Sequence, residues 1–219
     1  MGAMMFGAWG NPDHGESIRI IHGALDAGIN FIDTADVYSR GESEEIVGRA
    51  LAGGRREQVV LATKVHGRMG DDPNQFGNTR RWIVQEVDNS LRRLGTDWID
   101  LYQIHRPEFD TDIDETLGAL TDLIRAGKVR MIGSSTFPAH AIVEAQWVAE
   151  RRGRERFVCE QPALLAADPR HRGRRVAGGG GLRDGRDPVE PACRRLAERS
   201  LEQGQPAPQR TRRHGAPPL

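Results

Sequence analysis

Residues 98–105 read WIDLYQIH, an apolar run that ends in a histidine. Two earlier runs have the same form: NFID at 30–33 ends in an aspartate, and QVVLATK at 58–64 ends in a lysine. Short apolar runs of this kind are typical of buried parallel strands, and the carboxyl ends of such strands carry the site in a parallel barrel. We therefore expect four polar side chains to meet at one end of a sheet: Asp33, Tyr38, Lys64 and His105.

The segments between these runs have the spacing of amphipathic helices. Apolar residues recur at Ile18, Ile21, Ala24 and Leu25, for example, and Gly28 follows as a residue suited to close a helix. Alternating strands and helices predict a parallel sheet. The expected helices cover residues 16–27, 43–51, 80–93, 113–125 and 139–151, and two further strands are expected near 129–132 and 157–159.

This repeat predicts an α/β fold of the (β/α)8 TIM-barrel type, but an incomplete one. A complete barrel usually needs about 250 residues, and this chain has 219. About six βα units are recognisable if residues 1–7 form the first strand. We assign residues 1–162 to a partial barrel and residues 163–219 to a separate tail.

The tail differs sharply in composition from the rest of the chain. After Pro162 there is no Ile, Phe, Trp, Tyr, Met or Lys, and arginine, glycine and proline are frequent. Such a segment buries too little apolar surface to offset its ordering entropy, so we expect it to be disordered. Residues 182–199, translated one nucleotide later with allowed synonymous codons, can give YGMGVIPWSPLAGGWLSG. We therefore interpret the tail as a frameshift product, with a natural disordered tail and an arginine-rich nucleic-acid arm as the alternatives.

Composition narrows the classes of partner. Basic and acidic residues are equal in number, 31 of each, so no overall field draws the protein to nucleic acid or an anionic membrane. The two cysteines, Cys159 and Cys193, lack the spacing of a disulfide framework or a zinc site. No apolar run approaches the roughly 18 residues of a membrane span. We expect a cytoplasmic protein that binds a small molecule and no metal; the composition leaves the oligomeric state open.

The four polar residues suit proton transfer to an oxygen atom. A phenol, with an ordinary pKa near 10, is a poor acid or base at neutral pH unless a cation favours its ionised form. Lys64 is the candidate cation for Tyr38, and Asp33 beside it would keep the ammonium charged. His105 would then direct a carbonyl oxygen toward the phenol. None of these groups supplies hydride, so the chemistry requires a cofactor.

Three segments resemble the catalytic segments of the aldo-keto reductases, in the family's order: DTADVYS at 33–39, ATK at 62–64 and LYQIH at 101–105. Residues 41–51, GESEEIVGRAL, resemble the helix after the tyrosine in the branch of bacterial reductases and potassium-channel β subunits. The resemblance runs from about residue 2 to 162. It implies a (β/α)8 barrel that reduces an aldehyde or ketone with NADPH, with catalytic Asp33, Tyr38, Lys64 and His105.

The same resemblance implies a cofactor site. IGSSTF at 132–137 is similar to the family's Ser-Asn segment that holds the nicotinamide carboxamide, with Thr136 where Asn is usual, and Gln161 matches the glutamine that joins it. Ser135, Thr136 and Gln161 are therefore the expected cofactor-binding residues. The usual N-terminal hairpin and the loop for the pyrophosphate and 2′-phosphate are not found, so we expect this chain to be weak or inactive.

Two other functions stay open. Channel-associated members of the family couple cofactor state to a partner, which implies a non-catalytic, cofactor-sensing accessory protein as one alternative. A metal-dependent barrel hydrolase is the other, since Lys64, His105 and Asp33 stand where barrel enzymes place metal ligands. The hydrolase would need more histidines, and no HxH motif occurs in the first strand.

Overall fold

A computed structural model describes residues 1–162 of the chain; the predicted tail, 163–219, and its frameshift interpretation lie outside the described residues. Strands and helices alternate, as the sequence predicts. The strands are β1 (Phe31–Asp33), β2 (Val60–Val65), β3 (Ile99–Ile104), β4 (Val129–Ser135) and β5 (Cys159–Gln161). The helices are α1 (His14–Asp26), α2 (Glu42–Leu51), α3 (Arg80–Leu94), α4 (Ile113–Arg125) and α5 (Ala139–Arg152), with 3-10 turns at Tyr38–Gly41 and Arg56–Gln58.

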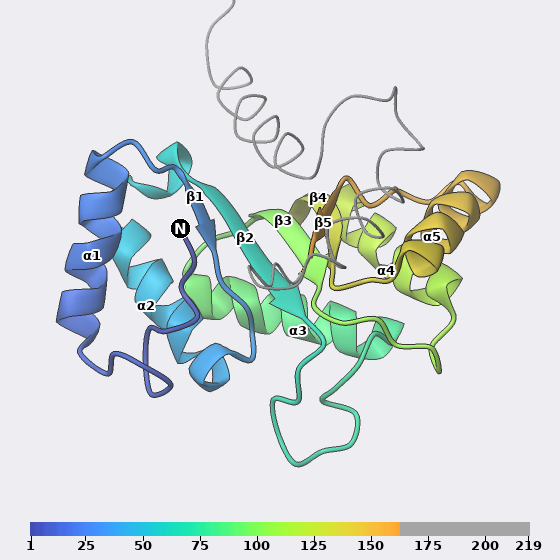
Figure 1. The fold of residues 1–219 in the computed structure, drawn as a ribbon, viewed down its shortest axis with the longest axis horizontal. Helices are drawn as coiled ribbons and strands as arrows, with labels where there is room; N and C mark the ends of the chain where they lie inside the picture. The colour runs from blue at the N-terminus through green and yellow to red at the C-terminus, as the bar shows by residue number, and fades with distance from the viewer. Residues whose placement is uncertain (163–219) are drawn as a thin grey trace, which may run out of the picture.

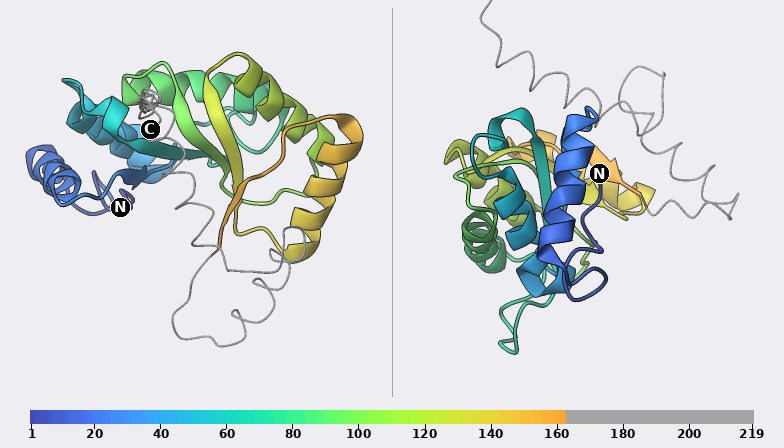
Figure 2. Two further views of the ribbon diagram at one scale, coloured as in Figure 1. Left: turned by 90° about the horizontal axis from the view of Figure 1, so that it is seen from above. Right: turned by 90° about the vertical axis from the view of Figure 1, so that its left-hand side faces the viewer.

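The five strands form one parallel sheet in chain order, β1-β2-β3-β4-β5. Asp33 pairs with Ala62, Lys64 with Gln103, and Ser135 with Gln161, so the carboxyl ends of all five strands lie at the same edge. The sheet curls, and the helices cover its outer, convex side (Figure 1; Figure 2, left). The described chain is thus a curled half-barrel, and the expectation of an incomplete parallel barrel is confirmed.

The expected first strand at residues 1–7 is wrong in extent. Only a short stretch pairs with β1: the Met1 amino group donates to the Phe31 carbonyl at 2.7 Å, and the Ala3 N–H donates to the Asp33 carbonyl at 2.8 Å. The chain then turns at once, since the Phe6 N–H donates back to the Ala3 carbonyl. Gly2 forms only an isolated bridge with Asp33. The sheet within residues 1–162 therefore has five strands, one fewer than the six βα units expected from the sequence.

Side-chain caps fix where the helices begin. Asp13 accepts from the Glu16 N–H ahead of α1, and Thr79 accepts from the Trp82 N–H ahead of α3. Asp112 caps α4 in the same way. Each cap satisfies one of the N–H groups that the first helical turn leaves without a partner. This is why α1 begins at His14, two residues before the apolar spacing becomes visible in the sequence.

The two faces of the sheet are packed very differently. The outer face meets the helices in one large cluster of buried side chains that includes Trp82, Tyr102 and Leu120. Within residues 1–162, the buried apolar cluster on the inner face has only three members, Ala62, Leu101 and Cys159, with Phe31 and Met131 partly buried beside them. Since full burial of a large aliphatic side chain contributes about 2 kcal/mol, most of the apolar stabilisation lies between sheet and helices.

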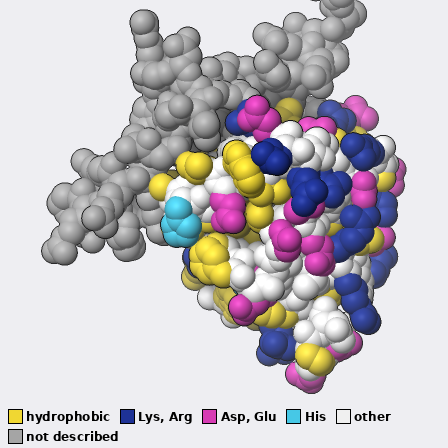
Figure 3. All heavy atoms as spheres, turned by 90° about the vertical axis from the view of Figure 1, so that its right-hand side faces the viewer, with side chains coloured by type: hydrophobic (Ala, Val, Ile, Leu, Met, Phe, Trp, Pro, Cys, Tyr) yellow, Lys and Arg dark blue, Asp and Glu magenta, His cyan; other side chains and the backbone are white. Residues whose placement is uncertain are grey.

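The surface over α5 mixes basic, acidic and apolar side chains, without one dominant sign of charge (Figure 3). On α5, the large apolar residues Val143 and Trp147 are exposed. Within residues 1–162 no helix has both the length and the apolar character that crossing a bilayer requires.

Candidate active site

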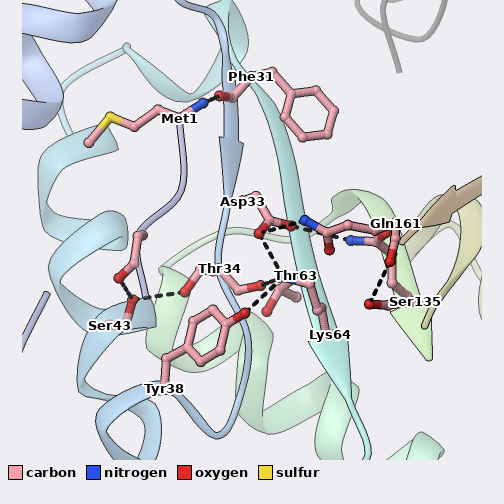
Figure 4. Close-up of polar contacts among 12 residues, drawn as sticks. Met1, Phe31, Asp33, Thr34, Tyr38, Ser43, Thr63, Lys64, Ser135 and Gln161 are labelled. Carbon is pink, nitrogen blue, oxygen red and sulfur yellow. Dashed lines mark hydrogen bonds and ion pairs between the residues drawn. The ribbon is translucent and has the colours of Figure 1, made fainter. Parts of the chain in front are cut away.

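The structure brings the four predicted polar residues together at the carboxyl edge of the sheet. Figure 4 shows three of them, Asp33, Tyr38 and Lys64. Asp33 ends β1, Lys64 is the penultimate residue of β2, and His105 directly follows β3. Tyr38 begins the 3-10 turn after β1. The sheet register alone aligns the three strand ends, because neighbouring parallel strands finish at the same edge.

Lys64 is the centre of this group. Its ammonium donates to Asp33 Oδ2 at 2.7 Å, to the Thr34 carbonyl at 2.8 Å and to the Tyr38 hydroxyl oxygen at 3.3 Å. The Lys64 side chain is 1% exposed and that of Asp33 15%. A buried charge is tolerated only when it is paired and hydrogen-bonded, and here the ammonium's three bonds and the carboxylate meet that demand.

Tyr38 is held by its ring as well as by its hydroxyl. The ring meets that of His105 edge-on, with centroids 5.6 Å apart, and lies 6.2 Å from that of Trp9. The next residues, Ser39 and Arg40, have φ values of 49° and 55°, a left-handed bend that few side chains adopt. The Ser39 hydroxyl donates to the Phe6 carbonyl at 3.2 Å, so the N-terminal segment supports the bend.

His105 is neutral at physiological pH. Burial lowers the pKa of its imidazole to about 3, and the positive charges of Lys64, Arg106 and His66 act in the same direction. A neutral imidazole carries one N–H donor and one bare nitrogen. The ring can therefore donate a hydrogen bond to an oxygen in the site without holding a positive charge there.

The expected cofactor residues lie at the ends of β4 and β5. Ser135 donates through its hydroxyl to the Gln161 carbonyl at 3.1 Å, and the Thr136 N–H donates to the same carbonyl at 3.0 Å. The Gln161 amide donates to Asp33 Oδ2 at 3.4 Å, a long contact that links the two groups of residues (Figure 4). The buried Gln161 Oε1 has no partner within the described residues. A carboxamide NH2 is the kind of donor this oxygen needs, so these residues fit a nicotinamide.

Sequence reasoning missed Gln103. Its amide donates to Asp33 Oδ1 at 3.3 Å, so both oxygens of the carboxylate accept hydrogen bonds. Gln103 precedes His105 by two residues, and residues two apart on a strand point to the same face. That alternation was the available signal, and it places Gln103 on the same face as the histidine.

A second polar group missed by sequence reasoning lies on the helix side of the sheet. Asp36 is fully buried, and burial together with the carboxylates of Glu44 and Glu86 raises the pKa of its carboxyl well above the ordinary value. Arg93 pairs with Glu44 at 2.6 Å and also with Glu86. The Asp36 N–H donates to the Lys64 carbonyl at 3.1 Å, which ties this cluster to the strand that carries the lysine.

The residues that the structure describes contain no group of three histidine, cysteine, aspartate or glutamate side chains placed to hold a metal ion. Arg106 stands next to His105 and is exposed, and its guanidinium donates to the Thr136 hydroxyl at 3.1 Å. The site as a whole is lined by a hydrogen-bonded lysine, a phenol, a neutral imidazole and amide groups, and the exposed Arg106 places a positive charge at its rim.

Known proteins are similar to this chain in sequence. The chain is 48% identical over 130 residues to aldo-keto reductase YhdN of Bacillus subtilis, covering 59% of this chain and 39% of that protein. It is 38% identical over 165 residues to a probable voltage-gated potassium channel subunit beta of rice, Oryza sativa, covering 73% of this chain and 50% of that protein.

A solved structure is also similar. The aldo-keto reductase AKR11C1 from Bacillus halodurans, in its holo form, matches with a TM-score of 0.65 and 36% identity over 75% of this chain and 52% of that one. The chain spans about half or less of the length of these relatives. The family model for "Aldo/keto reductase family" matches residues 1–174. The chain therefore belongs to the aldo/keto reductase family.

Proposed function

We propose that this site reduces an aldehyde or ketone to an alcohol with NADPH, and that Tyr38 donates the proton. One observation carries the proposal: the Lys64 ammonium lies 2.7 Å from the Asp33 carboxylate and 3.3 Å from the Tyr38 hydroxyl. A cation in that place favours the ionised form of the phenol, and so lowers the cost of giving up the proton. The carboxylate keeps the lysine charged in a buried setting.

Each residue has a separate part in the reaction. The nicotinamide, when bound, supplies hydride to the carbonyl carbon. The neutral His105 ring donates a hydrogen bond to the carbonyl oxygen and orients it toward Tyr38. The Tyr38 hydroxyl protonates that oxygen as negative charge develops on it, and Lys64 stabilises the phenolate that is left. Thr34 and Asp33 hold the ammonium in place throughout.

We assign the nicotinamide carboxamide to Ser135, Thr136 and Gln161. Support comes from the unpaired Gln161 Oε1, and from the hydrogen bonds that draw Ser135 and Thr136 to the Gln161 carbonyl. The choice of NADPH over NADH rests on the resemblance of the segments to the family. We also propose that the substrate is a small carbonyl compound and that the protein is cytoplasmic. As the sequence leads us to expect, the proposed activity of this chain is low.

A non-catalytic role is the second candidate, favoured by the identity to the rice protein named a potassium channel subunit beta. In that role the same site would bind NADPH and report its redox state to a partner. The two candidates differ in one measurable property, since only the enzyme turns over a free aldehyde.

The chain offers a matched pair of variants for the test, because it contains only two tyrosines, Tyr38 and Tyr102. We expect the purified chain to oxidise NADPH slowly in the presence of a simple aromatic aldehyde, and the loss of NADPH absorbance measures the rate. Tyr38→Phe should lower that rate by at least about 100-fold, the scale of general acid catalysis. The same variant should retain NADPH binding, measured by fluorescence.

Tyr102→Phe is the control, because this hydroxyl is buried and has no hydrogen-bond partner within residues 1–162. It should leave the rate within about twofold of the parent chain, since only a hydroxyl without a partner is removed. Near-normal turnover by Tyr38→Phe would contradict the assigned proton donor. NADPH binding with no turnover in the parent chain would instead favour the accessory role.

A further inference from the structure

Thr136 has an unusual backbone conformation. Its φ is +58°, in the left-handed region that disfavours branched side chains. Four residues other than glycine have positive φ within residues 1–162, and Thr136 is the only β-branched one among them. A strained residue persists only where its surroundings determine its conformation, and such residues cluster at functional sites.

Three contacts hold the chain at this point. The Thr136 N–H donates to the Gln161 carbonyl at 3.0 Å, and the Ser135 hydroxyl donates to the same oxygen at 3.1 Å. From the other side, the Arg106 guanidinium donates to the Thr136 hydroxyl at 3.1 Å. The first two contacts hold the backbone of the turn and its neighbour, and the third holds the side chain of the strained residue itself.

Arg106 is well placed to act as a clamp. Its backbone follows His105, whose N–H donates to the Val65 carbonyl at 2.9 Å, and its own carbonyl accepts from the Asn78 side chain at 3.0 Å. The side chain then crosses from the end of β3 to the end of β4. Within residues 1–162, Arg106 forms no ion pair, so no carboxylate draws its guanidinium away from Thr136.

We propose that Arg106 is a cofactor-positioning residue: its guanidinium holds Thr136 in the left-handed conformation, and so sets the places of Ser135 and Gln161 against the nicotinamide carboxamide. The identity of the ligand rests on the proposed function. The clamp between Arg106 and Thr136 does not, because it is visible in the protein alone.

The clamp makes a distinctive prediction about asparagine. Asparagine adopts the left-handed conformation far more readily than threonine, because its short polar side chain can hydrogen-bond locally. Thr136→Asn should therefore raise the thermal midpoint of the full chain. It should also make Arg106 dispensable, because asparagine adopts the left-handed conformation without the hydrogen bond from the guanidinium.

The experiment is a double-mutant cycle on the full chain. The variants are Arg106→Met, which keeps the aliphatic stem but removes every donor, Thr136→Asn, and both together. Arg81→Met on the exposed side of α3 is the control for losing one surface arginine. Two quantities are measured for each: the midpoint of thermal unfolding, and the dissociation constant for NADPH from fluorescence.

Arg106→Met alone should lower the midpoint and weaken NADPH binding about tenfold, the change that loss of one charge-assisted hydrogen bond produces. In the Thr136→Asn background the same substitution should change binding by less than about twofold. Arg106→Lys should restore part of the affinity in the threonine chain, since an ammonium can still donate. Arg81→Met should change neither quantity.

Two results would overturn the proposal. Equal effects of Arg106→Met in both backgrounds would show that Arg106 acts independently of Thr136. No effect on the unfolding midpoint or on binding in either background would show that the contact holds nothing. If no variant binds NADPH, the proposed function fails, and the unfolding cycle still decides whether the clamp exists.

Discussion

The two sides of the site are held together in different ways. On the side of β1 and β2, the buried Lys64 ammonium contacts both Asp33 and Tyr38 directly through their side chains. On the side of β4 and β5, Ser135 and Thr136 both donate to one backbone carbonyl, that of Gln161. The first side is a charge network inside the protein, whereas the second depends on where a three-residue strand lies.

This difference indicates which property each side controls. A buried network fixes the distance between donor and acceptor and changes abruptly when one member is lost. Contacts to a backbone carbonyl at the end of a short strand change gradually as the strand shifts. Substitutions on the β1–β2 side should therefore affect the chemical step and stability, and those on the β4–β5 side should affect cofactor affinity.

The largest effect is expected from Lys64→Met. Removing the ammonium leaves the Asp33 carboxylate without its ion-pair partner, which should lower the free energy of unfolding by about 3–5 kcal/mol. Reduction should slow by about 10² to 10⁴, and the reverse oxidation of an alcohol should require a higher pH, because no cation favours the phenolate. Urea unfolding and the pH profile of alcohol oxidation measure both.

The chain contains a matched control for this change. Its only other lysine is Lys128, at the opposite end of β4, where it pairs with Asp88 on the surface. Lys128→Met should cost no more than about 1 kcal/mol, as surface ion pairs usually contribute little. An unchanged pH profile in Lys64→Met would remove the lysine from the proposed mechanism.

A second, smaller effect should appear as pH falls. The folded-state pKa of His105 is about 3 and the unfolded value is near 6.5, so the unfolded chain binds a proton first. The stability linked to this histidine is complete above pH 6.5 and is lost as pH falls toward 3. Between pH 7 and pH 4 the loss should be on the order of 2 kcal/mol, after a discount for the ring's partial exposure.

His105→Gln isolates this contribution, since glutamine does not titrate in that range. The parent chain should lose more stability than the variant between pH 7 and pH 4 in urea unfolding at each pH. Parallel curves would mean that the imidazole is as easily protonated in the folded protein as in water. The β1–β2 side would then tolerate a second cation beside Lys64.

The smallest effect is expected on the other side of the site. Gln161→Leu removes the unpaired Oε1 acceptor and the long contact to Asp33, so NADPH binding should weaken about two- to tenfold, as for one neutral hydrogen bond. Gln146→Leu is the matched control. Gln146 lies on α5, and its amide donates to the backbone carbonyl of Phe157, just before β5, rather than to a residue of the site. This substitution should lower stability slightly and leave affinity unchanged.

Equal losses of affinity from Gln161→Leu and Gln146→Leu would show that only the position of β5 matters. A large loss of stability in Gln161→Leu would show that the two sides are one network. Fluorescence titration with NADPH and thermal unfolding separate these outcomes.

Much of the fold was predictable because its signals are local. The spacing of apolar residues placed all five helices within two residues at each end, with capping side chains such as Asp13 accounting for the shift at α1. The ends of the apolar runs placed Asp33, Lys64 and His105 at one edge of the sheet. The short stretch after Met1 was beyond such reasoning, because a turn closed by a single backbone hydrogen bond leaves no periodic pattern.

The site was less predictable, because its geometry depends on contacts between distant residues. Resemblance identified Thr136 but not its left-handed backbone, which follows from contacts with Gln161 and Arg106. The buried Asp36 reads as an ordinary turn residue in the sequence. Its neighbours Glu44 and Glu86 come from α2 and α3, so only the packed helices reveal it.

The scarcity of tyrosine gives the molecule a built-in optical probe. Burial and the carboxylates of Asp36, Glu86 and Glu44 raise the pKa of the Tyr102 phenol well above its ordinary value. Tyr102 should therefore contribute no phenolate absorbance in an alkaline titration of the folded protein. Because the chain has only one other tyrosine, the phenolate signal would come from Tyr38 alone. A change in charge near Lys64 would then alter the pH dependence of the ultraviolet phenolate absorbance, which can be measured without label or substrate.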